Sequence, residues 1–125
     1  ESVEVARSFA SRAGSEVFVT DDPTEAVSGA DAVYTDVWVS MGEEEQSEQR
    51  MRTLAPYQVN DELMDRTGNP SSIFLHCLPA VRGNEVTSEV MDGPRSRIWD
   101  EAENRKHTIK AVMLATMLAP SELPV

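Results

Sequence analysis

The sequence predicts an α/β domain built on a parallel sheet. Short apolar segments alternate along the chain with stretches that carry helix-capping residues, and strands separated by helices usually pair in parallel through right-handed crossovers. The 125 residues suit one modest domain with its own core, without internal repeat or interdomain linker. Loops that follow the strands should therefore meet at one edge of the sheet.

The chain begins with a predicted helix and a predicted strand. Val5, Phe9 and Ala13 share one face of the helix, and Gly14 can end it. Residues 16–19, Glu-Val-Phe-Val, then form a short buried strand.

A second helix and strand follow. Asp22 caps a brief helix, Pro23 opens it and Gly29 closes it. Residues 32–35, Ala-Val-Tyr-Thr, form the second predicted strand, which leads into the loop of residues 36–42.

The middle of the chain continues the alternation. Residues 43–52 carry acids first and bases last, which suits a helix dipole, and Asn60 begins another short helix. Residues 73–75 form the third strand, residues 87–91 one helical turn, and residues 97–99 the fourth strand.

The last predicted helix covers residues 101–118. Asp100 and Glu103 resemble a capping box at its start, and apolar side chains leave little polar surface beyond Lys110. Such a helix must pack on something.

Composition limits the possible partners and compartment. Asp and Glu number 22 against 11 Lys and Arg, and a net charge of −11 argues against nucleic acid. The single cysteine permits no internal disulfide, and no stretch suits a signal peptide or membrane span. We expect a cytoplasmic protein with no membrane contact, whose acidic residues 43–45 form a solvated face.

The loop after the second strand suits an amino acid's ammonium group. Asp36 supplies a carboxylate, Ser40 a hydroxyl, and Gly42 lets the backbone approach or move. The alternative is that Asp36 caps the helix starting near Glu43, with Trp38 and Met41 in the core.

The turn after the third strand carries His76, Cys77, Leu78 and Pro79. A lone cysteine after an apolar strand is more often a buried small hydrophobe than a site residue. Adjacent residues of an extended segment point to opposite faces, which argues against direct activation of Cys77 by His76. Two histidines and one cysteine without ligand spacing give no zinc site, and no metal or cofactor is predicted.

A third candidate lies in the first turn of the last helix. Arg105 could offer its planar donor fork to a carboxylate, phosphate or carbonyl oxygen. The alternative is a surface ion pair with Glu101 or Glu103.

These segments together resemble the ornithine carbamoyltransferase family. The resemblance rests on the order and spacing of Asp-Val-Trp-Val-Ser-Met-Gly at residues 36–42, His-Cys-Leu-Pro at 76–79 and Glu-Asn-Arg at 103–105, and it covers nearly the whole chain. It implies a Rossmann-like three-layer fold, incomplete here at its N-terminal side, in which residues 1–125 form part of the ornithine-binding domain. Family members usually assemble as homotrimers.

The resemblance also implies residue roles. Asp36, Ser40 and Met41 would hold L-ornithine, while His76, Cys77, Leu78 and Arg105 would contact carbamoyl phosphate. Cys77, His76 and Arg105 would act at the reacting centre, with His76 and Arg105 stabilising negative charge on the carbamoyl oxygen. The products would be L-citrulline and phosphate, as in arginine biosynthesis and the urea cycle.

The attacking amine raises a chemical difficulty. An alkyl amine with a pKa near about 10.4 must lose its proton to attack, at a cost of about 4 to 5 kcal/mol at neutral pH. Because a carboxylate favours the ammonium form, we hypothesise that Asp36 grips the α-ammonium and Cys77 contacts the reacting amine.

The chain also departs from the family pattern. The Ser-Thr-Arg-Thr-Arg and His-Pro-x-Gln segments of the carbamoyl-phosphate domain are absent, as is an earlier strand that helps bind ornithine. We therefore expect an inactive fragment that lacks an N-terminal domain, on which residues 101–118 would pack.

Three other functions compete. One is transfer to a related amine such as putrescine or a modified ornithine, and another is a non-catalytic amino-acid-binding module. A dinucleotide-dependent dehydrogenase is disfavoured because no Gly-x-Gly-x-x-Gly follows a strand.

Overall fold

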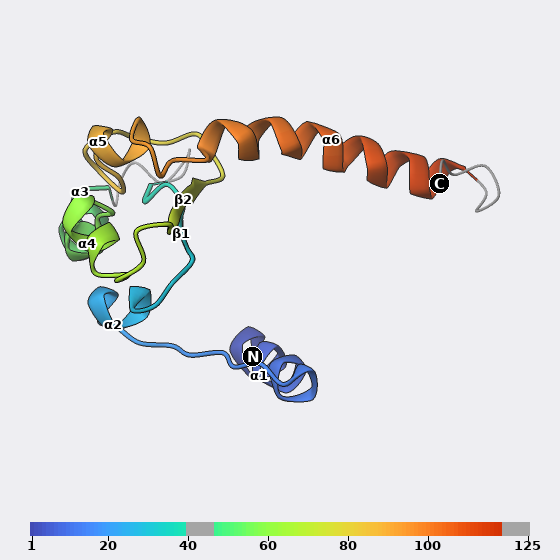
Figure 1. Cartoon of the computed structure of the whole chain (residues 1–125), viewed down its shortest axis with the longest axis horizontal. Coiled ribbons are helices and arrows are strands. Elements are labelled where there is room, and N and C mark those ends of the chain that lie inside the picture. The colour runs from blue at the N-terminus through green and yellow to red at the C-terminus, as the bar shows by residue number, and fades with distance from the viewer. Residues whose placement is uncertain (40–46, 119–125) are drawn as a thin grey trace.

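The computed structural model describes residues 1–39 and 47–118 and has the predicted α/β composition (Figure 1). Its helices and strands are, in chain order, α1 Ser2–Ala13, α2 Pro23–Val27, β1 Ala32–Thr35, α3 Ser47–Leu54, the 3-10 helix η2 Ala55–Tyr57, α4 Asp61–Asp65, β2 Ile73–His76, α5 Ser88–Met91 and α6 Ile98–Met117. The predicted helices at α1, α2, α4 and α5 are thus confirmed in their positions. The predicted helix at residues 43–52 is present from Ser47 onward, and its earlier part lies outside the described residues.

The sheet joins β1 and β2 in parallel, as the alternation of elements predicted. Its register pairs Val33 with Phe74 and Thr35 with His76. Both strands therefore end at the same edge, and the residues that follow them, Asp36 and Cys77, are neighbours in space. The expectation that these two loops face each other is confirmed.

The predicted strand at residues 97–99 is wrong in position. Backbone pairing beside β2 occurs slightly earlier, where the Phe74 amide donates to the Arg95 carbonyl at 2.9 Å and the Arg97 amide donates to the Phe74 carbonyl at 2.9 Å. The chain then turns at once into α6, because Ile98 is fully buried in the core and begins the helix.

The predicted strand at residues 16–19 is also wrong. This segment is extended between α1 and α2 but has no strand assignment, and Phe18 and Val19 are each 58% exposed. A strand exists only where its backbone groups pair with a neighbour. Within the described part of the chain, none pairs with residues 16–19.

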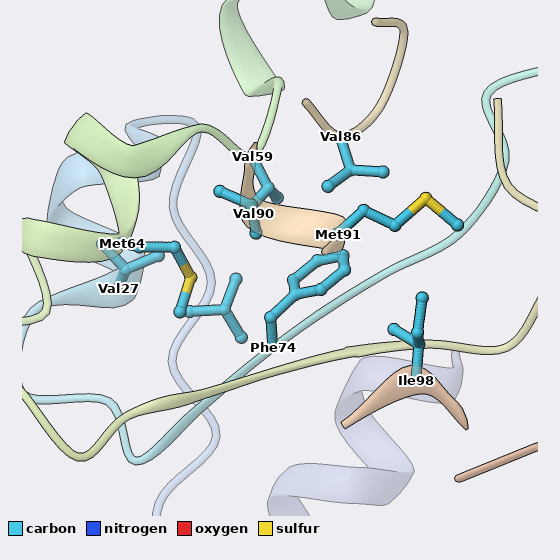
Figure 2. Close-up of a cluster of buried hydrophobic side chains, with 9 residues drawn as sticks. Val27, Val59, Met64, Phe74, Val86, Val90, Met91 and Ile98 are labelled. Atoms are coloured by element: carbon cyan, nitrogen blue, oxygen red, sulfur yellow. The ribbon is translucent and has the colours of Figure 1, made fainter. Parts of the chain in front are cut away.

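The hydrophobic core covers one face of β2 (Figure 2). Phe74 occupies its middle, with Val59, Val90 and Met91 around the ring. Among the described residues, the buried apolar members of this core are Val27, Val33, Val59, Met64, Phe74, Val86, Val90, Met91 and Ile98. This core fixes the direction in which β2 presents its alternate side chains.

Local capping explains where the short helices begin. The Asp22 carboxylate accepts the Thr24 amide at 2.8 Å, and the Asn60 side chain accepts the Leu63 amide at 2.9 Å. The predicted capping box at Asp100 is wrong, because α6 starts earlier with Arg97 at the N-cap position and without a side-chain cap.

Helix α6 extends away from the rest of the molecule (Figure 1). Its large exposed apolar side chains are Trp99, Ile109, Val112, Met113, Leu114 and Met117. The packing of residues 101–118 on another domain stays a prediction. Among the described residues, no helix combines the length and apolarity that crossing a membrane requires.

Candidate functional site

The two loops at the sheet edge meet through Asp36 and Cys77. The Cys77 thiol donates a hydrogen bond to Oδ1 of Asp36 at 2.9 Å. The same oxygen accepts the Val37 amide at 2.7 Å, which fixes the carboxylate against its own loop. The parallel register of β1 and β2 makes this pair possible, since it places the two strand ends side by side.

The electrostatics of this pair give it a single negative charge. Hydrogen bonds from the Cys77 thiol and the Val37 amide lower the pKa of Asp36. The hydrogen bond to Asp36, desolvation and the nearby carboxylate charge raise the pKa of Cys77. The site therefore combines an ionised carboxylate with a neutral thiol, a combination suited to bind a cation.

His76 lies on the opposite side of β2 from Cys77. Its side chain is fully buried, and its Nδ1 accepts the Leu78 amide at 2.8 Å. Its Nε2 lies 3.2 Å from Oε1 of Glu85. This geometry argues against the expected contact between His76 and a carbamoyl oxygen, because both ring nitrogens are engaged within the chain and the ring has no exposed surface. The signal was available in the sequence, since period-two alternation puts His76 on the same face as Phe74.

Glu85 is a site-supporting residue that sequence reasoning missed. It is fully buried, and its Oε1 accepts the Val81 amide at 2.6 Å as well as facing the His76 ring. Its other oxygen, Oε2, is buried without a partner in the structure. The carboxylate therefore holds both ends of the turn that contains Cys77 and Leu78. The only sequence signal was an acid directly before the apolar Val86.

The turn itself has an unusual backbone. Leu78 adopts a positive φ of 54°, and the Leu78–Pro79 peptide bond is cis. The Leu78 side chain is partly buried and packs against the core. The hydrogen bond from the Leu78 amide to the His76 ring links the residues on either side of Cys77, the catalytic candidate.

Tyr34 and Glu101 join the start of α6 to the sheet edge. The Tyr34 hydroxyl donates to Oε1 of Glu101 at 2.8 Å, and Oε2 of Glu101 accepts the His76 amide at 3.0 Å. The hydrogen bond to Glu101 raises the pKa of Tyr34 to about 12, so the phenol stays protonated. Through Glu101, the start of α6 is thereby attached to the backbone of His76, the residue before Cys77.

Arg105 lies one turn further along α6, at a surface hollow of about 650 Å³. The hollow is lined by Tyr34, Cys77, Glu101, Ala102, Asn104, Arg105, Thr108 and Ile109. The alternative ion pairs of Arg105 do not form, because Glu101 bonds to Tyr34 and His76, and Glu103 lies near Lys106 and His107. In residues 1–39 and 47–118, no side-chain hydrogen bond or ion pair is found for Arg105.

The structure thus brings Cys77, Asp36 and Arg105 to one region and turns His76 inward. Ser40 and Met41, the other expected ornithine contacts, lie outside the described residues, as does the helix start near Glu43. Among the described residues, no cluster of candidate metal ligands is found.

The α/β domain thus presents, at one sheet edge, a carboxylate with a neutral thiol beside a hollow that contains the Arg105 guanidinium, groups whose chemistry suits a small ligand with cationic and anionic or carbonyl parts. The family described as "Aspartate/ornithine carbamoyltransferase, Asp/Orn binding domain" matches residues 1–116. The chain belongs to this family.

Individual relatives agree with this assignment. The ornithine carbamoyltransferase of Pseudothermotoga lettingae is 61% identical over 110 residues, which make up 88% of this chain and 35% of that protein. The structure of the Pyrococcus furiosus ornithine carbamoyltransferase matches with a TM-score of 0.84 and 43% identity, over 98% of this chain and 38% of that one. An N-acetyl-L-ornithine transcarbamylase mutant matches with a TM-score of 0.73 and 33% identity, over 90% of this chain and 34% of that one. The chain therefore spans roughly a third of the length of these relatives.

Proposed function

We propose that this chain supplies the ornithine half of a carbamoyltransferase active site. The reaction transfers the carbamoyl group of carbamoyl phosphate to the side-chain amine of L-ornithine, giving L-citrulline and phosphate. The observation that carries this proposal is the 2.9 Å contact between Cys77 Sγ and Asp36 Oδ1 beside a hollow with an unpaired Arg105. The remaining contacts to carbamoyl phosphate come from sequence beyond this third of the relatives' length.

The contact between Asp36 and Cys77 changes the expected division of labour. Separate roles, with Asp36 on the α-ammonium and Cys77 on the reacting amine, require the two groups to bind different atoms. The 2.9 Å hydrogen bond between them supports a shared binding position instead. We infer that both contact the same amine, and that Ser40 and Met41 hold the other end of ornithine.

This arrangement also limits the proton chemistry. A shared carboxylate stabilises the ammonium form, and a thiol whose pKa is raised is a poor proton acceptor at neutral pH. Neither group is therefore the base that removes the amine's proton. The pair binds and orients the amine, and Arg105 stabilises negative charge on the carbamoyl oxygen as the amine attacks.

We propose contacts for the turn residues as well. Cys77 and Leu78 border the reacting carbamoyl group, whereas His76 positions them through its buried bonds to Leu78 and Glu85. The cytoplasmic location, the trimer and a role in arginine biosynthesis stay predictions; the free thiol of Cys77 supports a reducing compartment.

A chimera tests the function. This chain would replace the matching segment of the Pseudothermotoga lettingae ornithine carbamoyltransferase, whose sequence is 61% identical to it. We expect the chimera to form citrulline from ornithine and carbamoyl phosphate, and Arg105→Ala to lower kcat by about 100-fold or more, as for loss of one oxyanion donor. Arg12→Ala, on the surface of α1, is the matched control and should leave kcat unchanged.

The same chimera separates the competing functions. Putrescine and N-acetyl-L-ornithine are offered in place of ornithine at equal concentration. Faster carbamoylation of either one would reassign the substrate. Ornithine binding measured by calorimetry without any citrulline formation would favour a non-catalytic amino-acid-binding module.

A further inference from the structure

Glu101 and Arg105 lie four residues apart on α6, where an ion pair would normally form. A glutamate placed four residues before an arginine is the favourable orientation for a helical pair. Such pairs form elsewhere in the chain, since Glu48 lies 3.4 Å from Arg52 and Glu62 lies 3.1 Å from Arg66, each four residues on. The unpaired state of Arg105 therefore needs a local cause.

The cause is visible at the carboxylate of Glu101. Its Oε1 accepts the Tyr34 hydroxyl at 2.8 Å, and its Oε2 accepts the His76 amide at 3.0 Å. Both oxygens thus accept donors from the strand ends, and neither forms an ion pair with Arg105. Of these two donors to Glu101, the His76 amide is a backbone group that any residue at position 76 would supply. Tyr34 is therefore the donor that a side-chain substitution can remove.

We propose that Tyr34 is a positioning residue which keeps the Glu101 carboxylate away from Arg105, and so leaves the guanidinium free to bind the carbamoyl oxygen. This inference rests on the function proposed above for Arg105. Tyr34 also lines the hollow beside Cys77 and Arg105. Its protonated phenol, whose pKa is raised to about 12 by Glu101, remains a donor throughout the working pH range.

The test uses the chimera with three variants. Tyr34→Phe removes only one hydroxyl. Because Tyr34 is 56% exposed, the fold should tolerate the substitution. The released Oε1 of Glu101 then pairs with Arg105. We expect kcat to fall about three- to tenfold, with the KM for ornithine unchanged. The fall is modest because an exposed Glu–Arg pair on a helix is weak, and it is measurable because the pair becomes stronger where the substrate excludes water.

The double variant Tyr34→Phe/Glu101→Gln distinguishes positioning from simple structural support. An amide can still accept the His76 amide but forms no ion pair with Arg105, so most of the lost kcat should return. If Tyr34 were only structural, the double variant would be as impaired as Tyr34→Phe or worse. Tyr57→Phe is the matched control, because the chain's other tyrosine donates to the Asp21 carbonyl at 3.1 Å outside the site.

A crystal structure of Tyr34→Phe provides a readout that does not depend on activity. Glu101 and Arg105 should approach within salt-bridge distance. Glu101 remaining on the His76 amide with Arg105 unpaired, or a double variant no better than Tyr34→Phe, would overturn the inference. A parent chimera that forms no citrulline would instead count against the proposed function, and the structure of the variant would still decide the role of Tyr34.

Discussion

Replacement of Glu85 tests how the cysteine turn is held in place. Oε1 of Glu85 makes both contacts, to the Val81 amide at 2.6 Å and to His76 Nε2 at 3.2 Å. Because His76 Nδ1 accepts the Leu78 amide, it carries no hydrogen, and the hydrogen of the neutral ring lies on Nε2. His76 is therefore a neutral donor to Glu85.

This assignment gives different expectations for two substitutions. Glu85→Ala leaves two donors without an acceptor, each worth about 1 to 3 kcal/mol, so we expect a loss of about 3 to 5 kcal/mol in the free energy of unfolding. Glu85→Gln keeps one oxygen for both donors and replaces the unpartnered Oε2 by an amide group. The amide oxygen accepts both donors, though more weakly than a carboxylate, and we expect a loss below about 1.5 kcal/mol.

Urea unfolding followed by circular dichroism measures both variants. Glu16→Ala, which changes an exposed glutamate outside any helix or strand, is the control and should stay within about 0.5 kcal/mol of the parent. If His76 were a charged imidazolium, Glu85→Gln would strand a buried positive charge and cost about 3 to 5 kcal/mol. A glutamine variant as unstable as the alanine variant would therefore refute the assignment of His76 as a neutral donor.

Three further predictions concern the sheet edge and the first two helices. Asp36→Asn weakens the hydrogen bond and removes the charge with which Asp36 raises the pKa of Cys77, so the pH profile for alkylation of this single cysteine should shift to lower pH; an unshifted profile would contradict the assigned cause. Asp22→Ala should lower the free energy of unfolding by about 1 kcal/mol through loss of the α2 cap, and Asp21→Ala, which keeps that cap, should have little effect. Gly14→Ala should cost about 1 to 2 kcal/mol in thermal unfolding, purely from its left-handed backbone with φ of 70°, because the added Cβ meets no atom within 4 Å.

The sequence predicts local structure well where one residue decides the outcome. Asp22 and Asn60 cap their helices, and Gly14 ends α1, because each effect involves only neighbouring backbone groups. The apolar segment at residues 16–19 fails as a predicted strand for the opposite reason. A strand requires a partner from elsewhere in the chain, and composition alone does not supply one.

The same distinction between local and long-range contacts applies to the candidate site. Parallel topology was enough to predict that the loops containing Asp36 and Cys77 would meet. The inward orientation of His76 depends on a buried acceptor, Glu85, nine residues away. The unpaired state of Arg105 likewise depends on a hydroxyl from a different strand, so sequence spacing on α6 alone favoured the ion pair that the structure lacks.

Two carboxylates from later segments therefore define the position of the cysteine turn. Glu101 accepts the backbone amide of His76, and Glu85 accepts the hydrogen of its ring, so the residue before Cys77 is held from both sides. Because Glu101 also begins the helical turn that carries Arg105, the distance between the thiol and the guanidinium is set through one short chain of contacts. A substitution of a residue that makes these contacts should alter the reaction even where Asp36, Cys77 and Arg105 are unchanged. The inward orientation of His76 makes this histidine one of the residues that support the site.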